Sequence, residues 1–357
     1  MLGGPKKKIE TIIFNSTPFK GWYFITDGLA PKEVGGNFFE INKGDNYNLI
    51  NKLKEQAVIP YKGQGYIVPW YLKEKIDYDT HQHKKIASFF KDRLRKHLIN
   101  GYRWFQDKEH YWQHTFFNFV GADTLFSKVY YKFILRKYKR NLRASYEKNT
   151  ITSEQLSKIK RFIFVPLHYQ PEATTAPRGG LYSDQIYMIE KLRKVFPDDI
   201  ALVVKEHYSQ YRGMNTGFAG RYLGYWNKIA DIHNTYVVSL DMNSKDLILS
   251  SMAVATVTGT AGWEAIQYGR HCIIFGSAWY ESHPSVIKFG EADFDNKISD
   301  VINGIRPVDE TERFFKNFGR SLINNEIHGL YVKDEESIRS TDQIVSIVQE
   351  FCKKKCN

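Results

Sequence analysis

Three short segments of this 357-residue chain concentrate side chains that can do chemistry, and each follows an apolar run typical of a buried strand. The first holds a carboxylate at Glu172 and an imidazole at His168. The second reads Lys205-Glu206-His207-Tyr208, and the third is the Gly- and Thr-rich turn 257–264. A carboxylate can act as a general base or a nucleophile, and N–H groups at a helix start favour a phosphate. Taken singly, each segment also fits a structural role: a solvated loop, a structural histidine or a capped helix.

The surrounding pattern predicts the elements that position these segments. Strands are expected at 9–14, 22–26, 161–167, 200–204, 235–238, 253–257 and 271–275. Helices are expected within 80–146 and at 182–195, 216–230, 244–250, 261–268, 310–324 and 338–353. From residue 161 onward, apolar strands alternate with helical patterns, which indicates a parallel sheet covered on both faces. Ligands bind outside the carboxyl ends of such strands, where all three segments fall.

The order of these segments resembles the nucleotide-binding half of bacterial capsule polysaccharide biosynthesis glycosyltransferases, a group related to Kdo transferases. Glu172-Ala173-Thr174 is similar to the family's acidic element, and residues 205–208 are similar to its Lys-x-His-Pro element. Residues 258–265 are similar to its Ser/Thr-Gly turn followed by Gly-x-Glu-Ala. The chain departs from the pattern with Glu172 where Kdo-transferring members have Asp, and with Tyr208 in place of Pro. The resemblance covers about residues 161–290, and the first half shows none.

This resemblance implies a GT-B-like α/β fold. Its C-terminal domain would be a Rossmann-type parallel sheet with helices on both faces, and its N-terminal domain a smaller α/β or mostly helical unit. We expect the division at 1–155 and 156–357. The resemblance implies a glycosyltransferase that moves a sugar from a nucleotide sugar to a surface or capsular glycan, with a CMP-linked acidic sugar favoured over a UDP-sugar as donor. No cofactor is expected, and no Asp-x-Asp signature stands in a suitable loop, so transfer is predicted to be metal-independent.

Glycosyl transfer gives each candidate residue a role. Glu172 is the predicted base or nucleophile, with His207 as the second catalytic candidate. The predicted nucleotide-binding residues are Thr258, Gly259, Thr260, Ala261, Gly262 and Glu264, the last in the first turn of its helix as acceptor from the ribose. Predicted contacts with the donor or the acceptor are His168, Gln170, Arg178, Lys205 and Tyr280.

Positive charge is concentrated in the first half of the chain. The net charge is +12, and residues 1–160 hold 29 Lys and Arg against 15 Asp and Glu. The segment 80–146 is rich in basic and aromatic side chains. This composition suits binding to an anionic membrane surface, to which each cation contributes about 1 kcal/mol. It also fits helices whose aromatic side chains form a core and whose charges form the solvated face. We expect a cytoplasmic enzyme, peripheral at the inner face of the cytoplasmic membrane, because neither a signal peptide nor a long apolar span is evident.

Composition and motifs exclude several classes of protein. A hydrophobic content of 42% argues against intrinsic disorder, and three cysteines are too few for a disulfide framework. Neither a Walker pattern nor a G-x-G-x-x-G fingerprint is present, which argues against a P-loop enzyme and an ordinary NAD-binding domain. Three alternatives stay open: a nucleic-acid-binding protein, suggested by the basic pI near 9.3, a nucleotide-sugar epimerase on a similar fold, and an inactive scaffold. No nucleic acid partner is expected, because the basic half lacks a recognisable nucleic-acid module.

Overall fold

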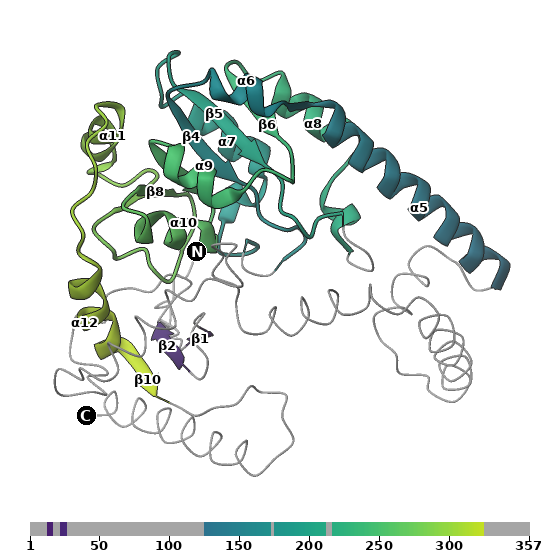
Figure 1. Ribbon diagram of the computed structural model, residues 1–357. Helices are drawn as coiled ribbons and strands as arrows, with labels where there is room; N and C mark the ends of the chain where they lie inside the picture. Colours follow the sequence, from purple (N-terminus) through teal and green to yellow (C-terminus); the bar gives the residue numbers. More distant parts are fainter. Residues whose placement is uncertain (1–12, 17–21, 27–124, 173–174, 212–215, 325–357) are drawn as a thin grey trace, which may run out of the picture. The chain divides into compact units, whose positions relative to one another are not determined.

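The computed structural model describes residues 13–16, 22–26, 125–172, 175–211 and 216–324 (Figure 1). A small antiparallel sheet contains β1 (Ile13–Ser16), β2 (Trp22–Thr26) and β10 (Leu322–Asn324), in the order β1-β2-β10. This sheet joins segments about 300 residues apart in the sequence. The strand expected at 22–26 is confirmed. Of the strand expected at 9–14, residues 13 and 14 belong to β1, which continues to Ser16, and residues 9–12 lie outside the described residues.

A seven-stranded sheet dominates the described structure (Figure 1). Its strands are β3 (Thr150–Ile151), β4 (Phe162–Pro166), β5 (Ala201–Lys205), β6 (Thr235–Val238), β7 (Ala253–Thr256), β8 (His271–Ile274) and β9 (Val286–Lys288). They lie in the order β3-β6-β5-β4-β7-β8-β9, and every neighbouring pair is parallel. The chain runs outward from β4 to β6 and then returns to β7 on the other side of β4. The topological switch point, where such sheets bind ligands, therefore lies between β4 and β7.

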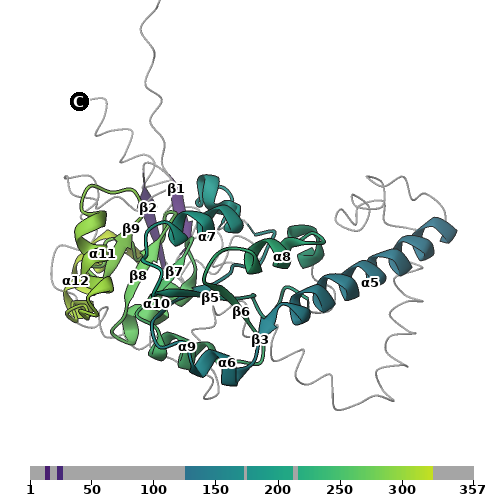
Figure 2. The same cartoon turned by 90° about the horizontal axis from the view of Figure 1, so that it is seen from above.

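Eight α-helices and two short 3₁₀ helices are described along the chain. The α-helices are α5 (Leu125–Lys148), α6 (Ser153–Ser157), α7 (Gln185–Arg193), α8 (Tyr225–Ala230), α9 (Ser244–Ser250), α10 (Thr260–Gln267), α11 (Phe294–Ile302) and α12 (Thr311–Ser321). The 3₁₀ helices are η1 (Gly180–Ser183) and η2 (Thr216–Gly220). Figure 2 shows α7 and α8 on one side of the sheet and α9 on the other.

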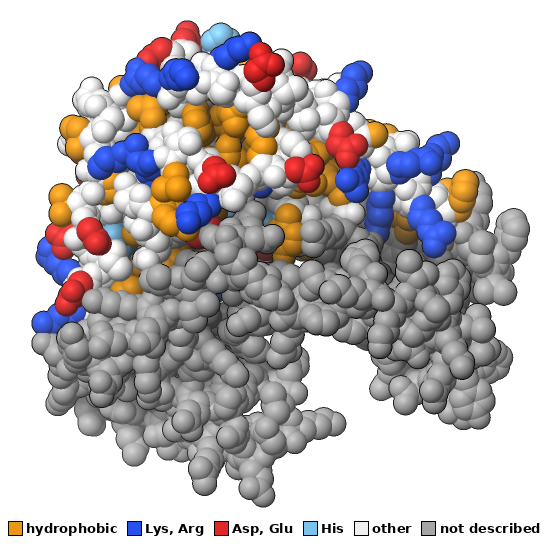
Figure 3. Space-filling view, viewed as in Figure 1, with side chains coloured by type: hydrophobic (Ala, Val, Ile, Leu, Met, Phe, Trp, Pro, Cys, Tyr) orange, Lys and Arg blue, Asp and Glu red, His pale blue; other side chains and the backbone are white. Residues whose placement is uncertain are grey.

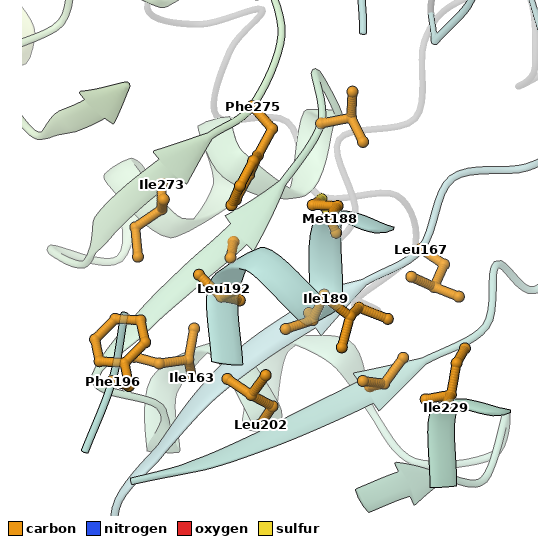
Figure 4. Packing of buried hydrophobic residues seen from close by; sticks show 14 of the residues in the cluster. Ile163, Leu167, Met188, Ile189, Leu192, Phe196, Leu202, Ile229, Ile273 and Phe275 are labelled. Carbon is orange, nitrogen blue, oxygen red and sulfur yellow. The ribbon is translucent and has the colours of Figure 1, made fainter. Parts of the chain in front are cut away.

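The core confirms helices on both faces, because successive residues of a strand point to opposite sides of the sheet. On one face, Ile163 of β4 belongs to a buried cluster with Met188 and Leu192 of α7 (Figure 4). On the other face, Phe164 is buried in a cluster with Ile248 of α9. Both faces of the sheet are therefore closed to water, and polar chemistry is confined to the strand ends.

The five strands expected from 161 to 275 are confirmed, with small shifts at their ends. The single helix expected at 216–230 is wrong. The segment forms η2 and then α8, since Gly224 adopts φ +89 between them and a Cβ at Gly220 would lie 2.4 Å from the Gln170 side chain. Three short strands, β3, β9 and β10, and the helices α6 and α11 were not expected from the sequence; β10 occupies the last three residues of the helix expected at 310–324.

Part of the expected helical content lies outside the described residues, including 338–353 and the portion of 80–146 before residue 125. The chain separates into two compact units, residues 1–67 with 146–357 and residues 68–145. The seven-stranded sheet begins at β3, before the expected division at residue 155. The expected division at residue 155 stays a prediction.

Candidate functional site

Loops after β4, β7 and β8 pack into a single edge at the switch point. A Cβ at Gly179 would lie 2.6 Å from Cγ1 of Val257, and one at Gly276 would lie 2.6 Å from the carbonyl oxygen of Arg178. The Ser277 N–H also donates to that carbonyl at 3.1 Å. Only glycine permits backbones to approach this closely, so these two glycines bring the candidate residues of separate loops together.

A carboxylate and an imidazole meet on the loop after β4. Nδ1 of His168 lies 2.7 Å from Oε1 of Glu172, and the Thr175 hydroxyl donates to the same oxygen at 2.7 Å. The His168 side chain is 6% exposed, whereas that of Glu172 is 28% exposed. Glu172 is therefore fixed by two donors and is still accessible from solvent.

The other nitrogen of this imidazole bonds to the turn after β7. Nε2 of His168 accepts the Thr258 N–H at 3.1 Å and lies 3.0 Å from Oγ1 of Thr256, which accepts the Gly259 N–H at 3.3 Å. A ring nitrogen that accepts an N–H carries no proton, so in the neutral ring Nδ1 carries it and donates to Glu172. Both ring nitrogens of His168, a predicted substrate contact, are thus bonded within the protein.

The predicted nucleotide-binding residues form the turn from β7 into α10. Gly259 is the N-cap of α10, and no side chain caps this helix start. In the described part of the chain, the buried hydroxyl oxygen of Thr258 has no hydrogen-bond partner. Thr260 and Ala261 form the first turn of α10, whose N–H groups and dipole favour an anion. The turn can therefore offer hydrogen-bond donors to a phosphate.

Two members of the predicted set lie deeper than expected. Glu264 is only 5% exposed and stands in the second turn of α10, not the first, because the helix begins at Thr260. A Cβ at Gly262 would lie 2.2 Å from the hydroxyl oxygen of Tyr280, so this glycine makes room for a buried tyrosine. The Tyr280 hydroxyl donates to the Gly259 carbonyl. Tyr280, predicted to contact substrate, supports the turn from inside the fold.

His207 follows β5 and presents a neutral ring. Its Nδ1 accepts the Ser209 N–H at 3.2 Å, so in the neutral ring Nε2 carries the proton. Burial lowers the pKa of His207 to about 4, although the nearby Glu172 carboxylate acts in the opposite direction. The ring of Tyr169 lies 6.0 Å away, edge to face. At neutral pH His207 is therefore an uncharged hydrogen-bond donor near Glu172.

The ammonium of Lys205 bonds to the segment after β6 and not to the other candidate residues. Its Nζ bonds to the Met242 carbonyl and, at 3.0 Å, to Oγ of Ser244 at the start of α9. The residue is 4% exposed, and this burial lowers the pKa of its ammonium to about 8. Lys205 ties the end of β5 to the loop after β6.

A buried ion pair under the site was missed by the sequence analysis. Nε and Nη2 of Arg221 donate to the two carboxylate oxygens of Glu206, both at 2.8 Å, and the side chains are 1% and 0% exposed. Nη2 also donates to the His168 carbonyl at 3.1 Å, and Glu206 accepts the His207 N–H at 2.8 Å. Glu206 and Arg221 lie 15 residues apart in the sequence, and no helical or strand periodicity connects them, so the sequence pattern could not predict this pair.

The two remaining candidates lie on the loop after β4. Gln170 is held by Gln210, which accepts its N–H and donates to its carbonyl, both at 3.0 Å. Gln210 is buried and was also missed. Among the described residues, Nε2 of Gln170 is buried without a partner. Arg178 is half-buried, and burial lowers the pKa of its guanidinium. Gln170 therefore packs against the segment after β5, whereas the Arg178 carbonyl contacts the loop after β8.

Within the described ranges, no three His, Cys, Asp or Glu side chains gather into a potential metal site. Of the helices that the structure describes, none is long and apolar enough to cross a membrane. The expectation of metal-independent transfer stays a prediction.

The topology and this polar edge define the class of the protein: a doubly wound, Rossmann-type α/β protein with a candidate site at its switch point. Residues 64–284 match the family model described as capsule polysaccharide biosynthesis protein, and the chain belongs to that family. The match extends about 100 residues before the segment in which the sequence analysis found a resemblance, so the family pattern includes much of the basic first half.

Two solved structures from Thermosulfurimonas dismutans are similar to part of the chain. With the KpsC beta Kdo 2,4 transferase, the TM-score is 0.32 at 12% identity, over 52% of this chain and 54% of that one. With the KpsC beta Kdo 2,7 transferase, the TM-score is 0.28 at 16% identity, over 52% and 61%. The matched region is less than two thirds of either structure's chain. No curated protein matches this chain.

Proposed function

We propose that this protein is a glycosyltransferase of capsule polysaccharide biosynthesis that uses a nucleotide-sugar donor. The observation that carries the proposal is that His168 links the Glu172 carboxylate to the turn before α10, at the switch point of the sheet. Transfer from a nucleotide sugar needs a carboxylate near the anomeric carbon and donors near the leaving phosphate. A partly exposed carboxylate and an uncapped helix start, linked through one imidazole, meet both needs.

In the proposed reaction, the bond between the anomeric carbon and the phosphate oxygen breaks, and its electron pair leaves with the nucleotide. An acceptor hydroxyl forms the new bond to the anomeric carbon. Glu172 takes the proton of that hydroxyl in an inverting reaction. In a retaining reaction Glu172 instead bonds to the anomeric carbon as the nucleotide leaves; the acceptor hydroxyl then displaces Glu172 and gives its proton to the phosphate of the released nucleotide. The N–H groups at the start of α10 and Nε2–H of His207 would stabilise the charge on the leaving phosphate.

We propose a CMP-linked acidic sugar as the donor, with a UDP-sugar as the second candidate. A thermal-shift comparison of CMP, UDP and GDP tests this choice. A nucleotide at 100 times its Kd adds about 2.7 kcal/mol, which corresponds to a rise of about 5–10 °C in Tm for a domain of this size. The largest response to CMP supports the proposal, and the largest response to UDP contradicts the donor choice.

The role of His207 is tested with a matched pair of variants. His207→Gln keeps an N–H donor near the position of Nε2, whereas His207→Leu removes it. We expect H207L to bind the nucleotide about 10-fold more weakly than H207Q, as for one lost hydrogen bond to a charged group. Equal affinities would remove His207 from the phosphate site.

The acceptor is proposed to be a glycan or lipid-linked glycan at the inner face of the cytoplasmic membrane. The described part of α5 supports this proposal, since Phe133 is 68% exposed and Ile134 is 39% exposed beside a basic surface. Exposed cations in the described part of the helix are Arg136, Lys137, Arg140, Arg143 and Lys148. Lys and Arg side chains follow α5 in Figure 3. A GT-B-like pairing of this sheet with a second domain for the acceptor belongs to the same proposal.

A further inference from the structure

We infer that His168 is a positioning residue, which holds the Glu172 carboxylate with Nδ1 and the phosphate-binding turn with Nε2. This inference rests on the proposed function, because it assigns a task to the two groups that His168 joins. Each ring nitrogen has its own partner: Glu172 at 2.7 Å on the loop after β4 and the Thr258 N–H at 3.1 Å after β7. The imidazole thus bridges the two strands between which the sheet order reverses.

The backbone of His168 is fixed as firmly as its ring. The Gln185 side chain accepts the His168 N–H at 2.7 Å, and Arg221 donates to its carbonyl at 3.1 Å. Gln185 and Arg221 are themselves 2% and 3% exposed. Because α7 and the buried ion pair hold its backbone, His168 has little freedom to move when a substrate binds. It can instead define the position of the groups bonded to it.

The turn after β7 packs closely against the His168 ring. A Cβ at Gly259 would lie 3.2 Å from both Cε1 and Nε2 of the imidazole, and 2.8 Å from Oγ1 of Thr256. Thr256 is 1% exposed and lies 3.0 Å from Nε2. The turn is therefore in close contact with the Nε2 side of the ring, so a shift of the turn changes the hydrogen bonds that the ring makes. Through this contact a bound phosphate and the orientation of Glu172 become coupled.

Substitutions with side chains of different length test the bond to Glu172 and the bond to Thr258 separately. The amide nitrogen of Asn reaches the place of Nδ1, so His168→Asn keeps a donor to Glu172 and loses the acceptor for Thr258. The amide oxygen of Gln reaches the place of Nε2, so His168→Gln keeps the acceptor and loses the donor. His168→Leu loses both. Each variant is compared with the wild type for nucleotide Kd by calorimetry and for kcat of sugar transfer.

We expect H168Q to keep the wild-type Kd within about twofold while kcat falls about 10- to 100-fold, the effect of one lost bond to a charged group. H168N should show the opposite pattern, with a weaker Kd and a kcat closer to wild type, and H168L should lose both. If all three variants change Kd and kcat alike, or change neither, the inference is overturned. A wild type that neither binds nor uses any nucleotide sugar refutes the proposed function instead.

A measurement without substrate tests the geometry itself. Nitrogen chemical shifts of ¹⁵N-histidine-labelled protein distinguish a protonated Nδ1 from a protonated Nε2, and the H168Q spectrum assigns the His168 signals. We expect Nδ1 to carry the proton and Nε2 to be unprotonated. The reverse assignment would overturn the positioning role, whatever the enzyme's activity.

Discussion

Replacement of Arg221 by Met is the most demanding test of how the site is supported. Arg221 forms two 2.8 Å bonds to Glu206 in a place where the two side chains are 1% and 0% exposed. Burial disfavours the charge of Arg221, yet the Glu206 carboxylate holds its pKa above the ordinary arginine value. Met fills a similar volume but has no charge, so R221M leaves a carboxylate in the interior without its partner.

Removal of one partner of a buried pair costs about 3–5 kcal/mol, because the remaining charge has no compensation. For a domain of 150–250 residues this corresponds to a fall in Tm of about 6–20 °C. The exposed pair Lys158–Glu154, with side chains 72% and 83% exposed, provides the control. Lys158→Met should change the free energy of unfolding by less than about 1 kcal/mol.

Urea denaturation followed by circular dichroism measures both changes. The double variant with Glu206→Gln and R221M should regain part of the loss, since no unpaired charge is left inside. If R221M unfolds within about 1 kcal/mol of the wild type, or no more readily than K158M, the buried pair does not support the loop after β4 and the reasoning is refuted.

Four further outcomes are expected. Gly262→Ala should destabilise the fold by about 1–3 kcal/mol in urea, because its Cβ would meet Tyr280. Burial lowers the pKa of His283 to about 4, below its unfolded value, so its share of stability is lost as pH falls from about 6.5 to 4. His283→Gln should flatten this part of the stability profile, and an unchanged slope would exclude the assignment. Sugar transfer should persist in EDTA, and loss restored by Mn²⁺ or Mg²⁺ would contradict metal independence. Vesicles with anionic lipid should bind the protein at low salt, and the variant Arg140→Glu/Arg143→Glu should bind less; equal binding would exclude α5.

Periodicity and strand-end composition were sufficient to predict five of the seven strands of the parallel sheet. The strand Phe162–Pro166 is a continuous apolar run, and Ala201–Lys205 is apolar up to its last residue, since both faces of a parallel sheet are buried. Short edge strands such as Val286–Lys288 carry too few residues to show a pattern. The helix expected at 216–230 was wrong because its glycines permit a turn that a helical pattern does not reveal.

The candidate site could be located from the sequence, but its internal bonds could not. Glu172 and Thr258 were identified because each follows an apolar strand, and strand ends meet at one edge of the sheet. The bond from His168 to Thr258 joins residues 90 positions apart, and its partners are fixed only by strand order. His168, Lys205 and Tyr280 were predicted as substrate contacts from their residue types and from their places in segments that follow strands. Their partners within the protein depend on burial, which residue type does not determine.

Release of nucleotide from a sugar donor tests the central claim most directly. Wild-type protein and Glu172→Gln are incubated with CMP-, UDP- and GDP-linked sugars, with and without a capsular glycan acceptor, and free nucleotide and extended glycan are quantified. The account predicts that the wild type releases CMP and extends the glycan, and that E172Q retains nucleotide binding while turnover falls at least about 100-fold. Equal turnover by E172Q, or conversion of the donor sugar without an acceptor, would contradict it.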